Sequence, residues 1–134
     1  MSKLSEIEGI GTYCAAKLQA IGVTSIETLL ERGRTPSGRR EMSNACEMDG
    51  ARILRWINMA DLMRIKGVGE EYSDLLEAVG VDTVKELRQR VPENLLQKMK
   101  AVNEEKKLVR QLPTLAGVTS WIEQAKELDD RIEY

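Results

Sequence analysis

The sequence predicts an all-α fold built from two tandem copies of one helical unit. Residues 7–29 resemble residues 65–87, and helix-capping motifs recur in both copies. No stretch shows the sustained alternation of apolar and polar residues that is typical of a strand. We expect unit one at residues 1–62, unit two at 63–128 and a short C-terminal tail at 129–134. Because no Gly/Ser-rich linker separates the copies, we expect them to pack as one compact body.

The repeat begins without gaps and then acquires an insertion. Ile-Glu-Gly-Ile-Gly at 7–11 recurs as Ile-Lys-Gly-Val-Gly at 65–69, an offset of 58 that also aligns later leucine and Gly-Val positions. Further along the chain, Trp56 matches Trp121 at an offset of 65. The second copy therefore carries seven extra residues in its middle. Equivalent tryptophans in a repeat are expected to share a packing role in the core.

Helix signals follow one another along unit one. Gly22 stands where a residue with positive φ commonly ends a helix, after an apolar face that includes Cys14. The word Thr-Ser-Ile-Glu, which begins at Thr24, predicts the cap of a short helix. Thr35 is followed by proline, which predicts a further helix start, and Asp49 is expected to cap the helix that carries the tryptophan.

Matching signals occur along unit two. Gly80 is expected to end its first helix, and Thr83 opens a Thr-x-x-Glu word that predicts the next cap. Pro92 and Pro113 punctuate this unit much as a proline punctuates unit one. Ser120 opens the word Ser-Trp-Ile-Glu, which predicts the cap of the last helix.

Two glycines separated by one apolar residue stand at the same place in both units. We call them the first glycine loop (Gly9–Gly11) and the second glycine loop (Gly67–Gly69). Such a pair lets the backbone turn sharply and leaves the amides at the start of the next helix accessible. Free amides at a helix N-terminus favour an anion such as a backbone phosphate. The alternative is that these glycines only form a tight corner between two helices.

At these residues the chain resembles the helix-hairpin-helix superfamily, which includes DNA repair glycosylases, DNA polymerase β, DNA ligases and Holliday-junction proteins. It is more closely similar to a bacterial family called domain of unknown function 4332, whose Leu-x-x-Ile-x-Gly-Ile-Gly opening appears at residues 4–11. The resemblance covers nearly the whole chain and implies two helix-hairpin-helix units. By position, it implies phosphate contacts from the amides of Gly9, Ile10, Gly11, Gly67, Val68 and Gly69.

The residues after each loop depart from the superfamily's pattern. DNA-binding members commonly place a lysine or arginine just after the second glycine, whereas Thr12 and Tyr13 follow the first loop and Glu70 and Glu71 follow the second. Two carboxylates suit the helix dipole but repel a phosphate. The first glycine loop is therefore expected to carry most of any phosphate binding.

Charge provides only local attraction for a polyanion. The formal net charge is −2, and the residues up to Leu62 hold 8 basic and 8 acidic side chains, against 12 and 14 in the remainder. Four cations within nine residues form a candidate phosphate-tracking patch, for which a solvated surface loop is the alternative: Arg32, Arg34, Arg39 and Arg40. A second basic stretch is interpreted as a solvated face: Lys98, Lys100, Lys106, Lys107 and Arg110.

The composition argues against an enzyme and against a cofactor or metal. Histidine is absent, which removes the usual general base and a common metal ligand. Cys14 and Cys46 are too few for a zinc site and are expected to be buried free thiols. No apolar run approaches the length of a membrane span, and the start lacks a secretion signal, so we expect a cytoplasmic protein.

Two hypotheses follow, and the sequence leaves the oligomeric state open. The first is a non-enzymatic module that binds DNA weakly through phosphate, without sequence selectivity. The second is an adaptor or scaffold for a protein partner, which includes self-association. For the first hypothesis the candidate nucleic-acid-binding residues are Gly9, Ile10, Gly11, Thr12, Arg34, Arg39, Arg40, Lys66, Gly67, Val68 and Gly69.

Overall fold

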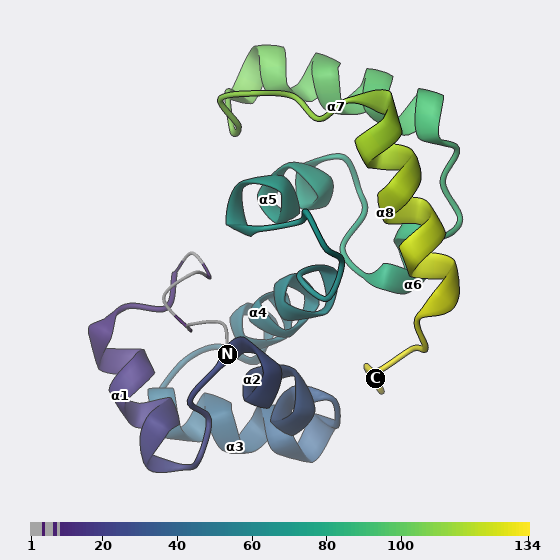
Figure 1. The fold of residues 1–134 in the computed structure, drawn as a ribbon. Coiled ribbons are helices and arrows are strands. Elements are labelled where there is room, and N and C mark those ends of the chain that lie inside the picture. Colours follow the sequence, from purple (N-terminus) through teal and green to yellow (C-terminus); the bar gives the residue numbers. More distant parts are fainter. Residues whose placement is uncertain (1–3, 5–6, 8) are drawn as a thin grey trace. The chain divides into compact units, whose positions relative to one another are not determined.

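Eight helices form in the part of the chain that the structure, a computed structural model, describes: Leu4, Ile7 and residues 9–134 (Figure 1). None of these residues lies in a strand, which confirms the all-α class. Contacts divide the chain into two compact units. Unit one comprises Met1–Asp61 with Arg131–Tyr134, and unit two comprises Leu62–Asp130.

The two units present equivalent helices in the same order. Unit one holds α1 (Thr12–Ala20), α2 (Ile26–Gly33), α3 (Pro36–Cys46) and all but the last residue of α4 (Gly50–Leu62). Unit two holds α5 (Glu70–Ala78), α6 (Val84–Leu87), α7 (Pro92–Lys106) and α8 (Leu115–Glu127). The insertion of unit two lies in its third helix and in the connection that follows, because α7 has 15 residues against 11 in α3.

The first helix of each unit ends in the same way. Gly22 has φ +90° and Gly80 has φ +93°, which are left-handed values that favour glycine. The Val23 amide donates to the Leu18 carbonyl at 2.9 Å, and the Gly22 amide donates to the Gln19 carbonyl at 3.1 Å. This pair of bonds is the Schellman motif, and it recurs at Gly80. The predicted helix ends are confirmed.

One predicted cap is displaced by a residue. The N-cap of α2 is Ser25, not Thr24: the Thr28 amide donates to Ser25 Oγ at 3.1 Å, and the Ser25 amide donates to Thr28 Oγ1 at 2.8 Å. The reason is burial, because Ser25 is buried whereas Thr24 is exposed. In unit two Thr83 caps α6 as predicted, accepting from the Glu86 amide at 3.3 Å.

The cap predicted at Ser120 is wrong. The N-cap of α8 lies six residues earlier, at Thr114, whose Oγ1 accepts from the Gly117 amide at 3.0 Å, so Ser120 lies inside the helix. Asp49 and Thr35 stand directly before α4 and α3, as predicted. Proline disfavours helical geometry in the residue before it but not in the residues after it. Thr114, which follows Pro113, can therefore cap α8 directly.

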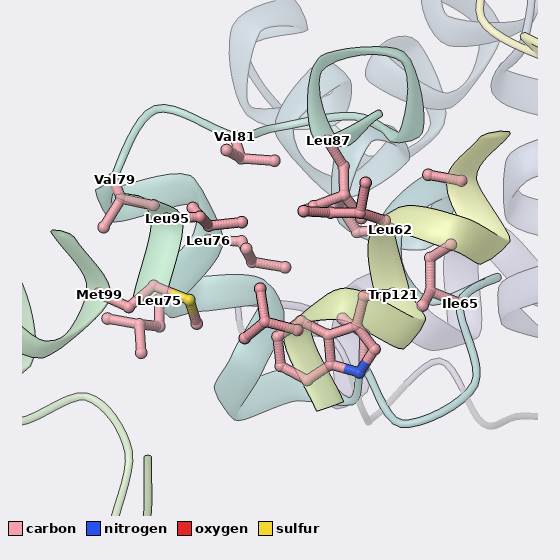
Figure 2. Packing of buried hydrophobic residues seen from close by; sticks show 14 of the residues in the cluster. Leu62, Ile65, Leu75, Leu76, Val79, Val81, Leu87, Leu95, Met99 and Trp121 are labelled. Atoms are coloured by element: carbon pink, nitrogen blue, oxygen red, sulfur yellow. The ribbon is translucent and has the colours of Figure 1, made fainter. Parts of the chain in front are cut away.

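The cores of the units are built from equivalent side chains. The predicted burial of both tryptophans is confirmed, since Trp56 and Trp121 are buried. Figure 2 shows the side chains gathered around Trp121 in unit two. Buried pairs at the two repeat offsets are Leu4 and Leu62, Ile7 and Ile65, Ile10 and Val68, Leu18 and Leu76, Val23 and Val81, Leu29 and Leu87, Ile53 and Val118, and Ile57 and Ile122.

Candidate nucleic-acid interface

The first glycine loop leads into α1 without a side-chain cap. Gly9 has φ +94°, and Gly11 is the N-cap of α1 with extended geometry. The first amide of the helix ladder is that of Ala15, which donates to the Gly11 carbonyl at 2.9 Å. The amides before it have no partner within the helix, because the first turn of any helix leaves its N–H groups unused. These amides can therefore serve a ligand.

The surroundings of this helix start are open and free of acids in the first turn. A side chain placed on Gly11 would meet no atom of the described chain within 4 Å. Tyr13 follows at the surface with 58% of its area exposed. The Lys17 ammonium lies 5.3 Å from the centre of the Tyr13 ring, within cation–π range. The i, i+4 spacing of an aromatic residue and a lysine is the sequence signal that could have indicated this pair.

The second glycine loop is held from beneath by α8. Gly67 has φ +98°, and Trp121 Nε1 lies 3.0 Å from where a Cβ on Gly67 would be. The Gln124 side chain binds the main chain of Lys66 twice, accepting from its amide at 2.8 Å and donating to its carbonyl at 3.2 Å. The loop is thus fixed before any ligand arrives.

An open pocket of about 530 Å³ lies in front of the second loop. Glu70 and Glu71 occupy the first turn of α5, as the sequence predicts. The α7–α8 connection adds Arg110, whose Nε lies 3.8 Å from the Glu71 carboxylate and whose side chain is 95% exposed. Tyr72 donates to the Gln111 carbonyl at 2.9 Å and so ties this connection to α5. Arg110 offsets part of the acidic charge at this loop.

The predicted arginine patch lies at the junction of α2 and α3, and we call Arg32, Arg34, Arg39 and Arg40 the arginine corner. Arg32 pairs with Glu41 at 3.0 Å, and Arg34 lies 3.5 Å from Glu31. Arg39 donates to the Gly33 carbonyl at 2.8 Å. Arg40 is exposed on α3. The corner is partly engaged in contacts within unit one.

The arginine corner and the first glycine loop lie at opposite ends of α1. Cys46, at the end of α3, donates to the Cys14 carbonyl in the first turn of α1 at 3.8 Å. Arg39 precedes Cys46 by about two turns of α3, which is roughly 10 Å along the helix axis. At the other end of α1, Arg32 Nη2 lies 3.3 Å from the Cβ position of Gly22. One phosphate cannot contact both groups.

The remaining predicted residues contribute through their backbone or their exposure. The Ile10 and Val68 side chains are buried, and their amides donate to the Ile7 and Ile65 carbonyls at 3.3 and 3.1 Å. These two positions therefore anchor the loops and do not offer a free amide. Thr12 is exposed at the first turn of α1, as is Lys66 beside the second loop.

The cysteines are free and buried, as expected. Burial raises the pKa of the Cys46 thiol from 9.0 to about 11, and the neighbouring Cys14 adds to the rise. A raised pKa keeps Cys46 protonated at neutral pH, which makes it a poor nucleophile. Among the described residues, no group of three or more Cys, Asp or Glu side chains is arranged to hold a metal ion.

The arrangement defines an all-α protein in which glycine loops precede uncapped helix starts in two units. A family model described as "Domain of unknown function (DUF4332)" matches residues 8–128, and the chain belongs to this family. No curated protein and no solved structure matches the chain. Among the described residues, no helix is both long enough and apolar enough to span a membrane.

Proposed function

We propose that the chain is a non-enzymatic helix-hairpin-helix module that binds nucleic acid weakly and without sequence selectivity. The observation that supports this function is the uncapped start of α1 behind the first glycine loop, which leaves amides free beside open space. A backbone phosphate is an anion of the size and charge that such a site accepts. The two free cysteines fit action in a reducing compartment such as the cytoplasm.

Tyr13 and Lys17 extend this site along α1. The exposed ring offers a face on which an unpaired base can stack, and stacking of this kind does not depend on the base. The Lys17 ammonium supplies a cation for the same strand. Because α1 is nine residues long, a strand bound at the first loop must extend roughly 13 Å to reach Arg32, which lies beside Gly22 at the other end of the helix.

The second glycine loop is a weaker site on this proposal. The two carboxylates after Gly69 oppose a phosphate, and an exposed arginine offsets only part of their charge. The binding should therefore be asymmetric between the loops. With few cations at each site the binding should be weak, and because phosphate contacts release counterions, affinity should fall as salt rises.

The experiment is a titration of labelled single-stranded and duplex oligonucleotides with the full chain, at about 20 mM and about 200 mM salt. Lys17→Glu should weaken binding by about fivefold, because it replaces a cation beside the Tyr13 ring with an anion on the proposed path of the strand. Lys100→Glu is the matched control, because it makes the same charge change on the exposed surface of α7. Glu71→Lys should strengthen binding.

Two results would overturn the proposal. One is the absence of detectable binding to DNA or RNA at the lower salt concentration. The other is an equal effect of Lys17→Glu and Lys100→Glu, which would reduce the binding to net charge alone.

A specific observation favours the adaptor hypothesis as a second candidate. Unit one already holds an extended peptide segment, residues 131–134 of the same chain, against the α2–α3 junction. A helical surface that accepts one extended segment is suited to accept another. The acidic second loop is compatible with this function, since a peptide partner need not be anionic.

A further inference from the structure

The C-terminal segment Arg131–Tyr134, which we call the tail, binds unit one through its main chain. The Glu133 amide donates to the Arg34 carbonyl at 2.7 Å. The Glu133 carbonyl accepts from Arg39 Nη2, also at 2.7 Å. Glu133 thus binds through both its amide and its carbonyl. This contact therefore recognises an extended main chain and does not depend on a particular side chain.

Unit one provides these partners because α2 ends at this place. Arg34 is the C-cap of α2, and the last carbonyls of a helix have no partner within it. The tail amide satisfies the Arg34 carbonyl. Arg39 bridges the Gly33 carbonyl and the Glu133 carbonyl with the two ends of one guanidinium. Such bonds are stronger than neutral ones because the donor is charged.

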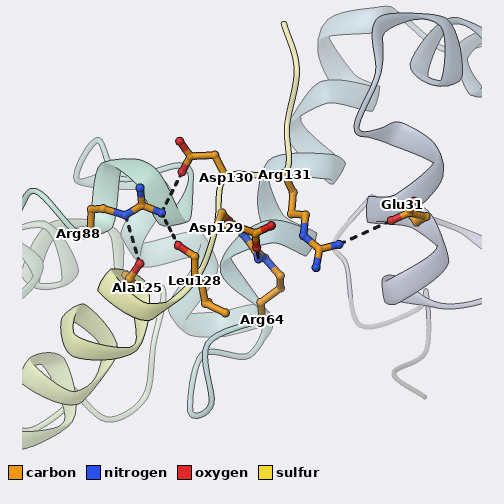
Figure 3. Close-up of polar contacts among 8 residues, drawn as sticks. All are labelled: Glu31, Arg64, Arg88, Ala125, Leu128, Asp129, Asp130 and Arg131. Atoms are coloured by element: carbon orange, nitrogen blue, oxygen red, sulfur yellow. Dashed lines mark hydrogen bonds and ion pairs between the residues drawn. The ribbon is translucent and has the colours of Figure 1, made fainter.

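The same chemistry holds the end of α8 in unit two (Figure 3). Arg88 donates to the carbonyls of Ala125 and Leu128 at 3.2 and 2.9 Å. Arg64 donates to the Asp129 carbonyl at 2.8 Å. Arginines that bind main-chain carbonyls are therefore a repeated device of this protein, and at the arginine corner the device acts on a segment from 94 residues away in sequence.

A side-chain contact adds selectivity at the arginine corner. Arg131 Nη1 lies 3.7 Å from Glu31 Oε2, as Figure 3 shows. Glu31 therefore favours a cation two positions before the residue that makes the main-chain contacts. An open pocket of about 450 Å³ also contains Glu31, together with Arg32, Thr35 and Glu41. This pocket gives a longer segment additional surface beside the tail.

The tail is positioned to be exchanged. Arg131, Glu133 and Tyr134 are exposed, so their contacts are open to water. A tethered segment has an effective concentration in the millimolar range, so a partner must add contacts to displace it. We propose that the arginine corner is a docking site for an extended peptide that carries an arginine two positions before the residue whose main chain it binds, and that the tail is its resident occupant. This site shares the arginine corner with the candidate nucleic-acid surface and gives the adaptor hypothesis a location.

The test uses a labelled peptide with the sequence of residues 129–134, Asp-Asp-Arg-Ile-Glu-Tyr, and the full chain. Glu133→Pro in the chain removes the tail amide that donates to Arg34, because proline has no N–H. Losing one hydrogen bond should loosen the tail and strengthen peptide binding by about two- to tenfold. Glu133→Ala keeps the amide and is the matched control. Fluorescence anisotropy measures each affinity.

A second variant tests the site itself. Arg39→Ala in the Glu133→Pro chain should abolish peptide binding, whereas Arg40→Ala, at an exposed neighbour, should not. Equal peptide affinity for the Glu133→Pro and Glu133→Ala chains, or unchanged binding after Arg39→Ala, would overturn the proposal. A concentration-dependent dimer that the peptide dissociates would support the proposal and identify a second copy of the chain as the partner. None of these results depends on whether the chain binds nucleic acid.

Discussion

Trp121 closes the second glycine loop from beneath, with its Nε1 atom 3.0 Å from the point where a side chain on Gly67 would begin. Trp56 has the same relationship to Gly9 at 3.3 Å. Each glycine is therefore required twice, once for its positive φ and once for the close approach of an indole. This explains why the glycines and the tryptophans recur together in both units.

The first prediction follows from this contact. Gly67→Ala should lower the free energy of unfolding by about 1–3 kcal/mol, since alanine must adopt a strained φ and displace the indole. Gly69→Ala is the control, because Gly69 has negative φ and no atom of the described chain within 4 Å of its Cβ position. Urea denaturation measures both variants. Equal destabilisation by the two would contradict the proposed role of the tryptophan contact.

The second prediction concerns the N-cap of α2. Ser25→Ala should destabilise unit one by about 1 kcal/mol, because it removes the oxygen that accepts from the Thr28 amide. Thr24→Ala should have a much smaller effect, since the Thr24 side chain is exposed. Thermal unfolding of the two variants decides between the positions. A larger loss for Thr24→Ala would restore the cap that the sequence predicts.

Local rules predicted most of the helix ends. The first helix of each unit ends at Gly22 and Gly80 because the Schellman hydrogen bonds require a residue with positive φ there. Glycine adopts this conformation readily, so a single glycine in the sequence predicts the helix end. The N-cap predicted at Thr24 is wrong because two adjacent residues carry a hydroxyl group, and the buried one, Ser25, forms the cap. The repeat offset of 58 pairs Ser25 with Thr83 and could have identified the correct residue.

The candidate site was only partly predictable, because distant contacts have no local signal. The glycine loops and the carboxylates of α5 were identified from their neighbours in sequence. The position of Arg110 beside Glu71 depends on how the α7–α8 connection returns to α5. Likewise, the contact of Arg39 with Glu133 is made by a main-chain carbonyl, which every residue carries. No motif can therefore reveal it.

The third prediction uses the end of α7. Lys107 is the C-cap of this helix with φ +51°, a left-handed value that costs a residue with a Cβ roughly 1 kcal/mol. Lys107→Gly should therefore stabilise the protein by about 0.5–1 kcal/mol. Lys107→Ala removes the same charge but keeps the strain, so it separates the two effects. A stability gain for alanine equal to that for glycine would show that charge, and not φ, is responsible.

The last prediction concerns pH and the Cys46 thiol, whose pKa burial raises from 9.0 to about 11. Because the folded protein holds this proton more tightly than the unfolded chain, the stability it contributes is complete below pH 9 and is lost as pH rises through about 11. The free energy of unfolding should therefore decrease with pH in this window more steeply for the wild type than for Cys46→Ala. Comparing the slopes removes the titration of lysines and tyrosines, which both proteins share. Parallel slopes would mean that Cys46 ionises as readily in the fold as in water, which the burial of its sulfur beside Cys14 argues against.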